Sequence, residues 1–534
     1  MPNSTIINKY IEKLLCYGII SLIDIILFAF ISSYYQYSSS NIKGGCQMKF
    51  TEETISSLFG SEAAEDEQPQ RLKEYYFKSE VYEKIHNNLP LKIIVGHKGI
   101  GKSAAFKISY LENISNNKIA IWIKPDDIME LCQSNDNMLS LIRDWKVGLS
   151  EIIFKKVMEN VGIEGKNEKI SPVLNYGGKL LSKITEVFKS KINDNIDTTT
   201  IHKDVISQYI SKNFLYVYID DLDRGWNGAE IGVRRISALL NAARDLTNDN
   251  PGLCIRISLR SDVYFLVRTS DESTDKIEGN VVWYKWTQHQ LLVMLAKRIE
   301  SHNGNKFDEK IWLKKPQFEI SKLYNNIFEE RFHGRGKWSD VPTFKVLASM
   351  IRRRPRDLVK ICTLAARTAY ENSHSIIKTD DWLDNFDYYS QERIQDTVNE
   401  YKSELPDIQR LLMGMKPSHK ERKTSAEFVY TSEELLKKIS IITGSNPFFF
   451  SNGEKATPED LAGFLYKINF LIARKKQQDN PNVIDRRYFE DNKYLSNKFI
   501  DFGYQWEVHP AFRWALYPDA GDCIYQSLSI DDEI

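Results

Sequence analysis

The sequence predicts an α/β fold, a parallel sheet flanked by helices, and three stretches support this prediction. Residues 93–95 form a short apolar run that leads through a glycine-rich loop into a helix-like segment, residues 104–111. Residues 214–219 form a second apolar run, which ends in aspartates, and residues 252–262 form a third with a polar end. Continuous apolar runs bounded in this way are typical of strands buried on both faces of a parallel sheet.

The composition describes a large globular chain with balanced charge. Its 534 residues suffice for two or three domains with sizeable cores. Lysine plus arginine and aspartate plus glutamate number 72 each, so no basic excess indicates a nucleic-acid partner. The six cysteines include no C-x-x-C pair, which argues against a zinc site or a disulfide framework and fits a reducing cytosol.

The N-terminal segment has two competing interpretations. Residues 14–35 are apolar over a length that can span a bilayer, although Asp24 near the middle would cost a few kcal/mol there. Lysines lie on both sides of the run, so the orientation of an inner-membrane anchor stays open, and no signal-peptide cleavage site follows.

In the second interpretation, residues 1–47 are a mis-assigned leader and a cytoplasmic protein begins at Met48. Residues 48–60 look like the start of a soluble chain. The codons of Lys43, Gly44 and Gly45 permit the ribosome-binding string AAGGAGG at a suitable distance upstream. N-terminal mass spectrometry of the native protein would decide between the two.

The glycine-rich loop after the first run matches the phosphate-binding pattern G-x-x-x-x-G-K-[ST]. Its residues are Gly96, His97, Lys98, Gly99, Ile100, Gly101, Lys102 and Ser103. Glycines let backbone N–H groups turn inward around phosphate oxygens, and the following helix N-terminus adds partial positive charge. We expect Lys102 to reach the β- and γ-phosphates of ATP and Ser103 to bind Mg²⁺. A plain glycine-rich turn is the alternative.

The second apolar run ends in Asp220-Asp221-Leu222-Asp223-Arg224, as a Walker B element requires. We expect Asp220 to hold Mg²⁺ through water and Asp221 to polarise the attacking water. An ordinary strand followed by a charged turn is the alternative, and the P-loop upstream argues against it.

Together these strings resemble a group of bacterial P-loop ATPases with the pattern GxKGxGKS…DDLDRGW…RPRD. The DDLDR string is similar to the KAP P-loop NTPases, many of which carry membrane segments, and the RPRDL string is similar to AAA+ and STAND-like ATPases. Asp221 stands where AAA+ proteins usually have a glutamate. The resemblance covers residues 50–516 and implies ATP hydrolysis, with defence or signalling roles among the relatives.

The resemblance also implies arginines that contact the nucleotide. Arg260 follows the third apolar run, where AAA-like ATPases place a γ-phosphate sensor. Within residues 344–370, Arg356 follows Pro355 at the start of a helix, as expected for a helical lid that contacts the nucleotide, and Arg354 is the second choice. A surface role is the alternative for each arginine.

Periodicity and capping patterns place the remaining elements. Residues 51–82 form an acidic lead-in, residues 119–124 a further strand, and residues 163–200 a lysine-rich connector. Expected helices span 138–161, 229–241, 287–298, 431–442 and 457–473, and an alternating strand spans 499–510.

Two helices followed by a β ribbon predict a winged-helix-like domain at the C-terminus. Its basic residues suit nucleic-acid phosphates, but a solvated face fits better because the domain shows no strong basic excess; they are Arg474, Lys475, Lys476, Arg486 and Arg487. His509 is expected to be structural. The predicted order is the segment 1–47, a P-loop core at 48–285, a helical lid at 286–390 and the winged-helix-like domain at 391–534.

The leading functional prediction is an ATP-driven switch that uses Mg²⁺, acts on an unidentified protein partner and assembles as a homo-oligomer. The alternatives are an ATP-dependent DNA-binding protein and a membrane-tethered, KAP-like NTPase with little hydrolysis.

Overall fold

A computed structural model describes residues 48–524, apart from 65, 130, 132–136, 162–212, 225, 227, 271, 424–427, 445, 477–483, 497–502 and 519–523. The predictions for residues 1–47 and for the connector at 163–200 lie outside the described residues. The chain divides into two units, Met1–Lys49 and Phe50–Ile534, and the elements below belong to the second. Across the described residues, no helix combines the length and the apolar composition that crossing a membrane requires.

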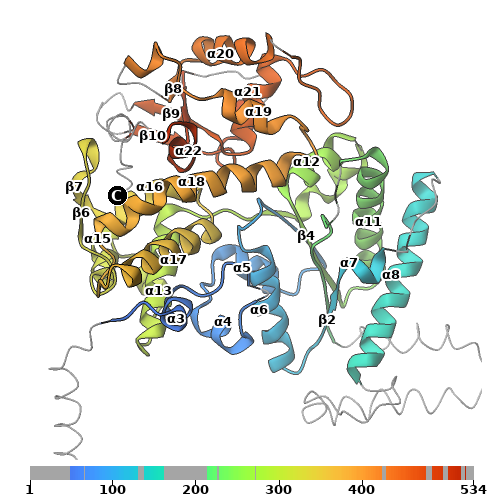
Figure 1. The fold of residues 1–534 in the computed structure, drawn as a ribbon. Helices are drawn as coiled ribbons and strands as arrows, with labels where there is room; N and C mark the ends of the chain where they lie inside the picture. The colour runs from blue at the N-terminus through green and yellow to red at the C-terminus, as the bar shows by residue number, and fades with distance from the viewer. Residues whose placement is uncertain are drawn as a thin grey trace, which may run out of the picture. The chain divides into compact units, whose positions relative to one another are not determined.

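A parallel sheet of five strands forms the centre of the N-terminal half (Figure 1). Its strands lie in the order β2-β3-β4-β1-β5, and every neighbouring pair is parallel. They are β1 (Leu91–Val95), β2 (Ile119–Ile123), β3 (Leu215–Ile219), β4 (Leu253–Leu259) and β5 (Val281–Trp283). All residues of β3 and β4 are buried, which explains why these strands are apolar apart from Arg256 and Ser258 of β4. The predicted parallel sheet flanked by helices is confirmed.

The two faces of the sheet pack against different helices. On one face, β1–β4 share a hydrophobic core with α8 (Met138–Val161) and α11 (Glu230–Asp249). On the other, α6 (Lys102–Ser115) places Phe106 with its ring 5.4 Å from Tyr218 of β3. Two shorter helices, α7 (Pro125–Ile128) and α12 (Ser261–Ser270), follow β2 and β4, and a 3-10 helix, η2 (Glu272–Asn280), precedes β5.

The lead-in before the sheet is helical, which its polar sequence did not predict. It forms α3 (Glu52–Phe59), α4 (Pro69–Tyr75) and α5 (Glu80–His86). Thr51 and Ser79 cap α3 and α5 by accepting backbone hydrogen bonds, and Pro69 lies in the first turn of α4. Each helix buries a few large apolar side chains among its polar residues, for example Leu58 and Phe59 in α3.

A helical region follows the sheet. Its helices are α13 (Gln288–His302), α14 (Glu309–Trp312), α15 (Gln317–Ser321), α16 (Thr343–Met350), α17 (Pro355–Glu371) and α18 (Thr379–Tyr401), with the 3-10 turns η3 (Lys322–Tyr324) and η4 (Gly336–Trp338) and a hairpin of β6 (Arg331–His333) and β7 (Ser339–Pro342). Thr287 and Gln290 form a capping box, so α13 begins where the sequence predicts. The helix α18 includes residue 390, where the sequence analysis placed the boundary between the lid and the winged-helix-like domain.

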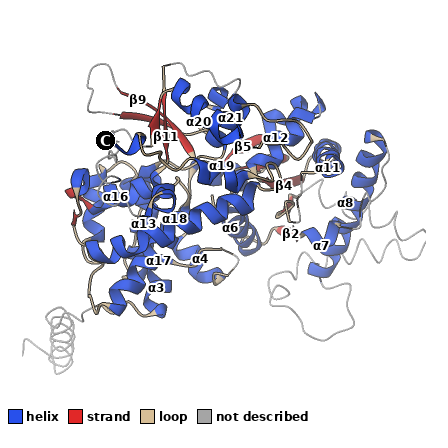
Figure 2. Cartoon of the chain, turned by 45° about the horizontal axis from the view of Figure 1, so that its top comes forward, coloured by secondary structure: helices blue, strands red, loops and turns tan. Residues whose placement is uncertain are grey.

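The C-terminal region combines helices with a four-stranded antiparallel sheet in the order β10-β9-β11-β8. Figure 2 shows this sheet beside its helices. The elements are α19 (Ile408–Gly414), η5 (Glu421–Lys423), β8 (Val429–Tyr430), α20 (Ser432–Gly444), α21 (Pro458–Lys467), β9 (Leu471–Lys476), β10 (Ile484–Arg487), η6 (Lys493–Ser496), β11 (Gln505–Val508), η7 (Pro510–Phe512) and α22 (Arg513–Leu516).

Two expected boundaries in this region are wrong. The helix expected at 457–473 ends at Lys467, because Asn469 takes a left-handed conformation (φ 57°) that breaks the helix, and residues 471–476 form β9 instead. The strand expected at 499–510 covers only Gln505–Val508 among the described residues, and Pro510 starts a 3-10 turn.

The basic ribbon is also different from the predicted solvated face. Arg474 and Arg486 are buried, with nitrogens 3.7 Å and 3.0 Å from Glu507, and Arg513 contacts the same carboxylate. Although burial favours the neutral acid, these guanidinium groups hold the pKa of Glu507 at about 2. Arg474 and Arg486 are therefore part of a buried ion-pair cluster, while Arg487 is exposed and pairs with Asp485.

His509 is buried in the same region. Its Nδ1 accepts a hydrogen bond from the Ala511 N–H (3.0 Å), and its Nε2 lies 3.1 Å from the Tyr488 hydroxyl. Burial lowers the pKa of His509 to about 3, so the ring is neutral.

Candidate nucleotide-binding site

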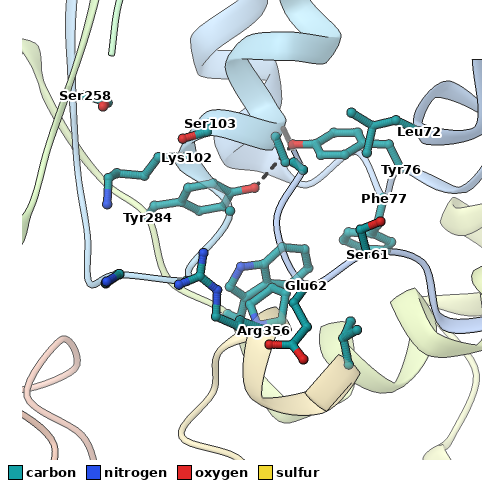
Figure 3. A pocket seen from close by; sticks show the side chains of 18 of the residues that line it. Ser61, Glu62, Leu72, Tyr76, Phe77, Lys102, Ser103, Ser258, Tyr284 and Arg356 are labelled. Carbon is teal, nitrogen blue, oxygen red and sulfur yellow. Dashed lines mark hydrogen bonds between the residues drawn. The ribbon is translucent and has the colours of Figure 1, made fainter. Parts of the chain in front are cut away.

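A cavity of about 260 Å³ lies at the carboxyl ends of β1, β3 and β4, next to the start of α6. It has a polar end, formed by the glycine-rich loop and the acidic turn after β3, and an aromatic end, formed by α4, the segment after it and the residues after β5 (Figure 3). The carboxyl ends of parallel strands are the usual place for ligands in α/β folds.

The glycine-rich loop connects β1 directly to α6. Gly99 and Gly101 have φ values of 78° and 102°, a region that residues with a Cβ rarely adopt. A Cβ at Gly99 would lie 3.0 Å from Arg356 Cβ, so this glycine also lets α17 approach the loop. Lys102 and Ser103 open α6 and face the cavity (Figure 3).

The Lys102 ammonium binds the loop itself. It donates hydrogen bonds to the carbonyl oxygens of Gly96 (2.8 Å) and His97 (3.2 Å). Burial lowers its pKa, while the carboxylates of Asp223 and Asp220, in this order of strength, raise it. A bound phosphate group offers Lys102 a stronger acceptor than these neutral carbonyls.

Asp220 is buried at the end of β3 with one carboxylate oxygen in use. Its Oδ1 accepts hydrogen bonds from the Ser258 hydroxyl and from the Asp221 N–H, the latter at 3.0 Å. Its Oδ2 makes no hydrogen bond within the described part of the chain. Asp220 and Ser103 line the same cavity, and a carboxylate with a hydroxyl is an oxygen donor set that suits Mg²⁺. These two residues would hold the ion, which neutralises phosphate charge when it is bound.

Asp221 and Asp223 both line the cavity from the turn after β3. Asp221 is exposed and has a left-handed backbone (φ 64°). Asp223 is less exposed, at 18% of its side chain, and its Oδ2 lies 3.3 Å from Arg260 Nη1. Sequence reasoning selected Asp221 and passed over Asp223, although the DDLDR string contains both.

Arg260 lies at the end of β4, on the cavity wall, and is fully engaged. Its guanidinium pairs with both oxygens of Asp262, including an Nε–Oδ1 distance of 3.0 Å, and donates to the Glu400 carbonyl oxygen at 2.8 Å. Although burial opposes the charged form, these acidic neighbours raise the pKa of Arg260 further above its ordinary value. Arg260 is thus at the position expected of a sensor, but other protein groups hold it.

Arg356 and Arg354 take different places at the start of α17. Arg356 lines the cavity, and its backbone N–H donates to the Gly99 carbonyl oxygen at 3.4 Å (Figure 3). Arg354 is buried behind the loop, where it donates to the Lys98 carbonyl oxygen (3.2 Å) and to Glu400 (3.1 Å). Of the two, only Arg356 lines the cavity.

In the first half of the loop, the His97 ring contacts other parts of the protein and not the cavity. His97 is buried; its Nδ1 lies 2.7 Å from the Tyr401 hydroxyl, and its Nε2 lies 2.5 Å from Glu490. The Lys98 N–H donates to Glu400 Oε1 at 2.9 Å, whereas the Lys98 side chain is exposed on the cavity side. Of the loop residues expected to contact the nucleotide, His97 therefore has its ring bound to other parts of the protein.

The aromatic end of the cavity was not predicted. The hydroxyls of Tyr76 and Tyr284 lie 3.3 Å apart (Figure 3). The Tyr284 ring stacks on Trp286 with ring centroids 5.9 Å apart. The Trp286 indole donates to the Ile100 carbonyl oxygen at 2.8 Å, which fixes this wall to the glycine-rich loop. Flat apolar walls of this kind suit a planar base. The two aromatic residues in the string Tyr284-Lys285-Trp286, directly after β5, were the sequence signal that could have indicated this wall.

The sheet order, the glycine-rich loop and the acidic turn define a P-loop NTPase fold. Residues 289–398 match the FunZ-associated C-terminal helical domain. The chain is 23% identical over 528 residues to the putative transposon gamma-delta 80.3 kDa protein of Escherichia coli (strain K12). The matched region covers 89% of this chain and 70% of that protein.

Solved structures resemble the chain only distantly. A Walker-type ATPase of Pyrococcus abyssi matches 79% of this chain and 95% of its own, at 11% identity and a TM-score of 0.36. The ORC2 protein of Aeropyrum pernix, solved as ADPNP–ADP complexes, matches 86% and 93% at 10% identity and a TM-score of 0.37.

Proposed function

We propose that the protein binds ATP with Mg²⁺ in this cavity, hydrolyses it, and passes the state of the P-loop to its C-terminal region. The loop, Lys102, Ser103 and Asp220 are the groups that such chemistry requires, and they line one cavity. Arg356 is the proposed lid contact to the γ-phosphate, and Arg260 a proposed positioning group.

The observation that carries the switch role is the contact between His97 and Glu490. His97 is the second residue of the P-loop. Glu490 follows β10 and lies 393 residues further along the chain. When phosphate replaces the Gly96 and His97 carbonyl oxygens as the partner of Lys102, the part of the loop that holds His97 loses two hydrogen bonds. Glu490 is in direct contact with that part.

The segment around Glu490 has further contacts with the P-loop core and with Arg353, which lies just before α17. Phe489 packs against Phe265 of α12 with ring centroids 5.3 Å apart, and Asp491 accepts from Arg353 at 2.7 Å. Lys493 lies 3.1 Å from the ring centroid of Trp283 at the end of β5, where burial lowers its pKa to about 8. A change at the P-loop therefore reaches a segment that is packed against the core on several sides.

Hydrogen exchange measured with and without ATP tests this proposal. We expect ATP to change exchange at residues 484–495 in the full chain. Glu490→Gln should bind ATP within about threefold of the unmodified chain but lose this response, because the ligand shifts conformations only through contacts that differ between them. Glu454→Gln, an exposed change in the same region, is the control. Exchange that does not respond to bound ATP would remove the switch role, and no ATP binding would remove the function itself.

The other expected properties stay proposals. Arg474 and Arg486 do not support a DNA-binding role, because both are buried and paired with Glu507. An unidentified protein partner and self-association fit a switch, and the domain match at 289–398 overlaps the proposed lid at 286–390. The winged-helix-like assignment of residues 391–534 rests on the order of α20, α21 and the β9–β10 ribbon.

A further inference from the structure

Two carboxylates follow Asp220 in the turn after β3, and their surroundings differ. The Asp221 side chain is exposed and makes no hydrogen bond or ion pair among the described residues. Asp223 is largely buried and pairs with Arg260 at 3.3 Å. A group that orients a water molecule must itself be held in place.

The partner of Asp223 is itself rigid. Arg260 is held by the carboxylate of Asp262, which is fully buried, and by the Glu400 carbonyl oxygen of α18. These contacts engage Nε and Nη2, so Arg260 presents its remaining nitrogen, Nη1, to Asp223 from a defined direction. Asp223 is therefore oriented by the sheet and by α18, whereas Asp221 is not.

Asp223 lines the same cavity as Lys102 and Ser103. Among the carboxylates whose charge raises the pKa of Lys102, Asp223 has the largest effect, ahead of Asp220. Lys102 is the group that the P-loop pattern assigns to the β- and γ-phosphates. Burial raises the pKa of Asp223 more than the charges of Arg260 and Lys102 lower it, which makes this carboxylate a better proton acceptor.

We infer that Asp223, and not Asp221, is the carboxylate that orients and deprotonates the attacking water during ATP hydrolysis. This inference rests on the proposed function. The water oxygen forms a bond to the γ-phosphorus, and the bond from that phosphorus to the bridging oxygen breaks, so the electron pair leaves with ADP. The water proton passes to the Asp223 carboxylate and from there to solvent, and the products are ADP and inorganic phosphate.

Asparagine substitutions in the full chain separate the two aspartates. Asp223→Asn keeps a group that can hydrogen-bond to Arg260, so we expect nucleotide affinity within about threefold of the unmodified chain and an unchanged melting temperature. Single-turnover hydrolysis should fall by about a hundredfold or more, as loss of a general base typically causes. Asp221→Asn should lower the single-turnover rate by less than about tenfold. Glu230→Gln, an exposed change at the start of α11, is the control for the neighbourhood.

Each other outcome has a defined meaning. Fast hydrolysis by Asp223→Asn with slow hydrolysis by Asp221→Asn would overturn the inference in favour of Asp221. An affinity loss beyond about tenfold in Asp223→Asn would make Asp223 a binding residue and would also overturn it. ATP binding without hydrolysis by the unmodified chain would overturn the inference but leave nucleotide binding in place. Absence of ATP binding would instead refute the proposed function.

Discussion

The two halves of the P-loop have different neighbours. The second half, residues 101–103, includes the start of α6 and lines the cavity. In the first half, the His97 ring and the Lys98 backbone N–H contact α18 and Glu490, whereas the Lys98 side chain lines the cavity. We call residues 101–103 the ligand-facing half, and the His97 ring with the Lys98 backbone the protein-facing half.

The P-loop pattern fixes some positions of the loop and leaves others free to contact the rest of the protein. Phosphate binding needs the glycines, the lysine and the hydroxyl, but it leaves the side chains at the x positions unconstrained. In this chain, the first x position is His97, whose ring contacts Tyr401 and Glu490 instead of the cavity. Substitutions in the protein-facing half should thus affect stability, and substitutions in the ligand-facing half should affect nucleotide affinity.

The largest effect is expected behind the loop. Arg354→Ala leaves the buried Glu400 carboxylate without its ion-pair partner, although the Lys98 N–H still donates to it, and breaking a buried ion pair in this way typically costs about 3–5 kcal/mol. Urea denaturation of the full chain should show this loss. Arg367→Ala, which removes an exposed pair with Glu52, is the control and should cost at most about 1 kcal/mol. Equal losses in the two variants would argue against a protein-facing half.

The decrease in the free energy of unfolding at acidic pH tests the protein-facing half of the loop through Glu490, the partner of His97. His97 holds the pKa of Glu490 at about 2, against 4.5 in the unfolded chain, although burial alone would raise it. A lowered pKa stabilises the fold above pH 4.5, and this contribution of about 3 kcal/mol is lost as the pH falls from 4.5 toward 2.

Glu490→Gln should therefore show a shallower loss of unfolding free energy between pH 4.5 and pH 2 than the unmodified chain, with the two curves converging at the acid end. Glu400 and Glu507, whose pKa values are also about 2, keep part of the slope in both proteins. The measurement is a series of urea titrations. Parallel curves would show that Glu490 does not carry this pH dependence.

In the ligand-facing half, Lys102→Ala should lower ATP affinity by about ten- to hundredfold. It removes a charge-assisted hydrogen bond to phosphate, typically about 1.5–3 kcal/mol. Equilibrium titration with a fluorescent ATP analogue measures the change, and circular dichroism checks that the fold persists. Affinity equal to that of the unmodified chain would separate the P-loop from nucleotide binding.

The smallest and most selective effect concerns Arg356, which packs on Gly99 and lines the cavity. Arg356→Ala should weaken ATP binding about tenfold and ADP binding much less, because the lost contact is to the γ-phosphate. Parallel titrations with ATP and ADP test this. Equal losses for both nucleotides would assign Arg356 to general binding and leave Arg260 as the candidate that distinguishes them.

Much of the N-terminal half could be predicted because its determinants are local. The β1–loop–α6 unit, the acidic end of β3 and the capped start of α13 each depend on residues within a few positions of one another. The end of α21 was missed because a single left-handed residue, Asn469, decided it. The aromatic wall was missed because Tyr76 and Tyr284 come from segments that no periodicity connects.

By itself, the sequence determined the parallel sheet, the phosphate loop and the carboxylates beside it, because backbone conformation and side-chain chemistry at short spacing specify them. Only the tertiary structure decided which charged residues are available to a ligand. Arg474 and Arg486 are buried and paired with Glu507, and His97 is bound by Tyr401 and Glu490. Their partners lie up to hundreds of residues away, and the free energy of burying a charge depends on partners that only folding brings together.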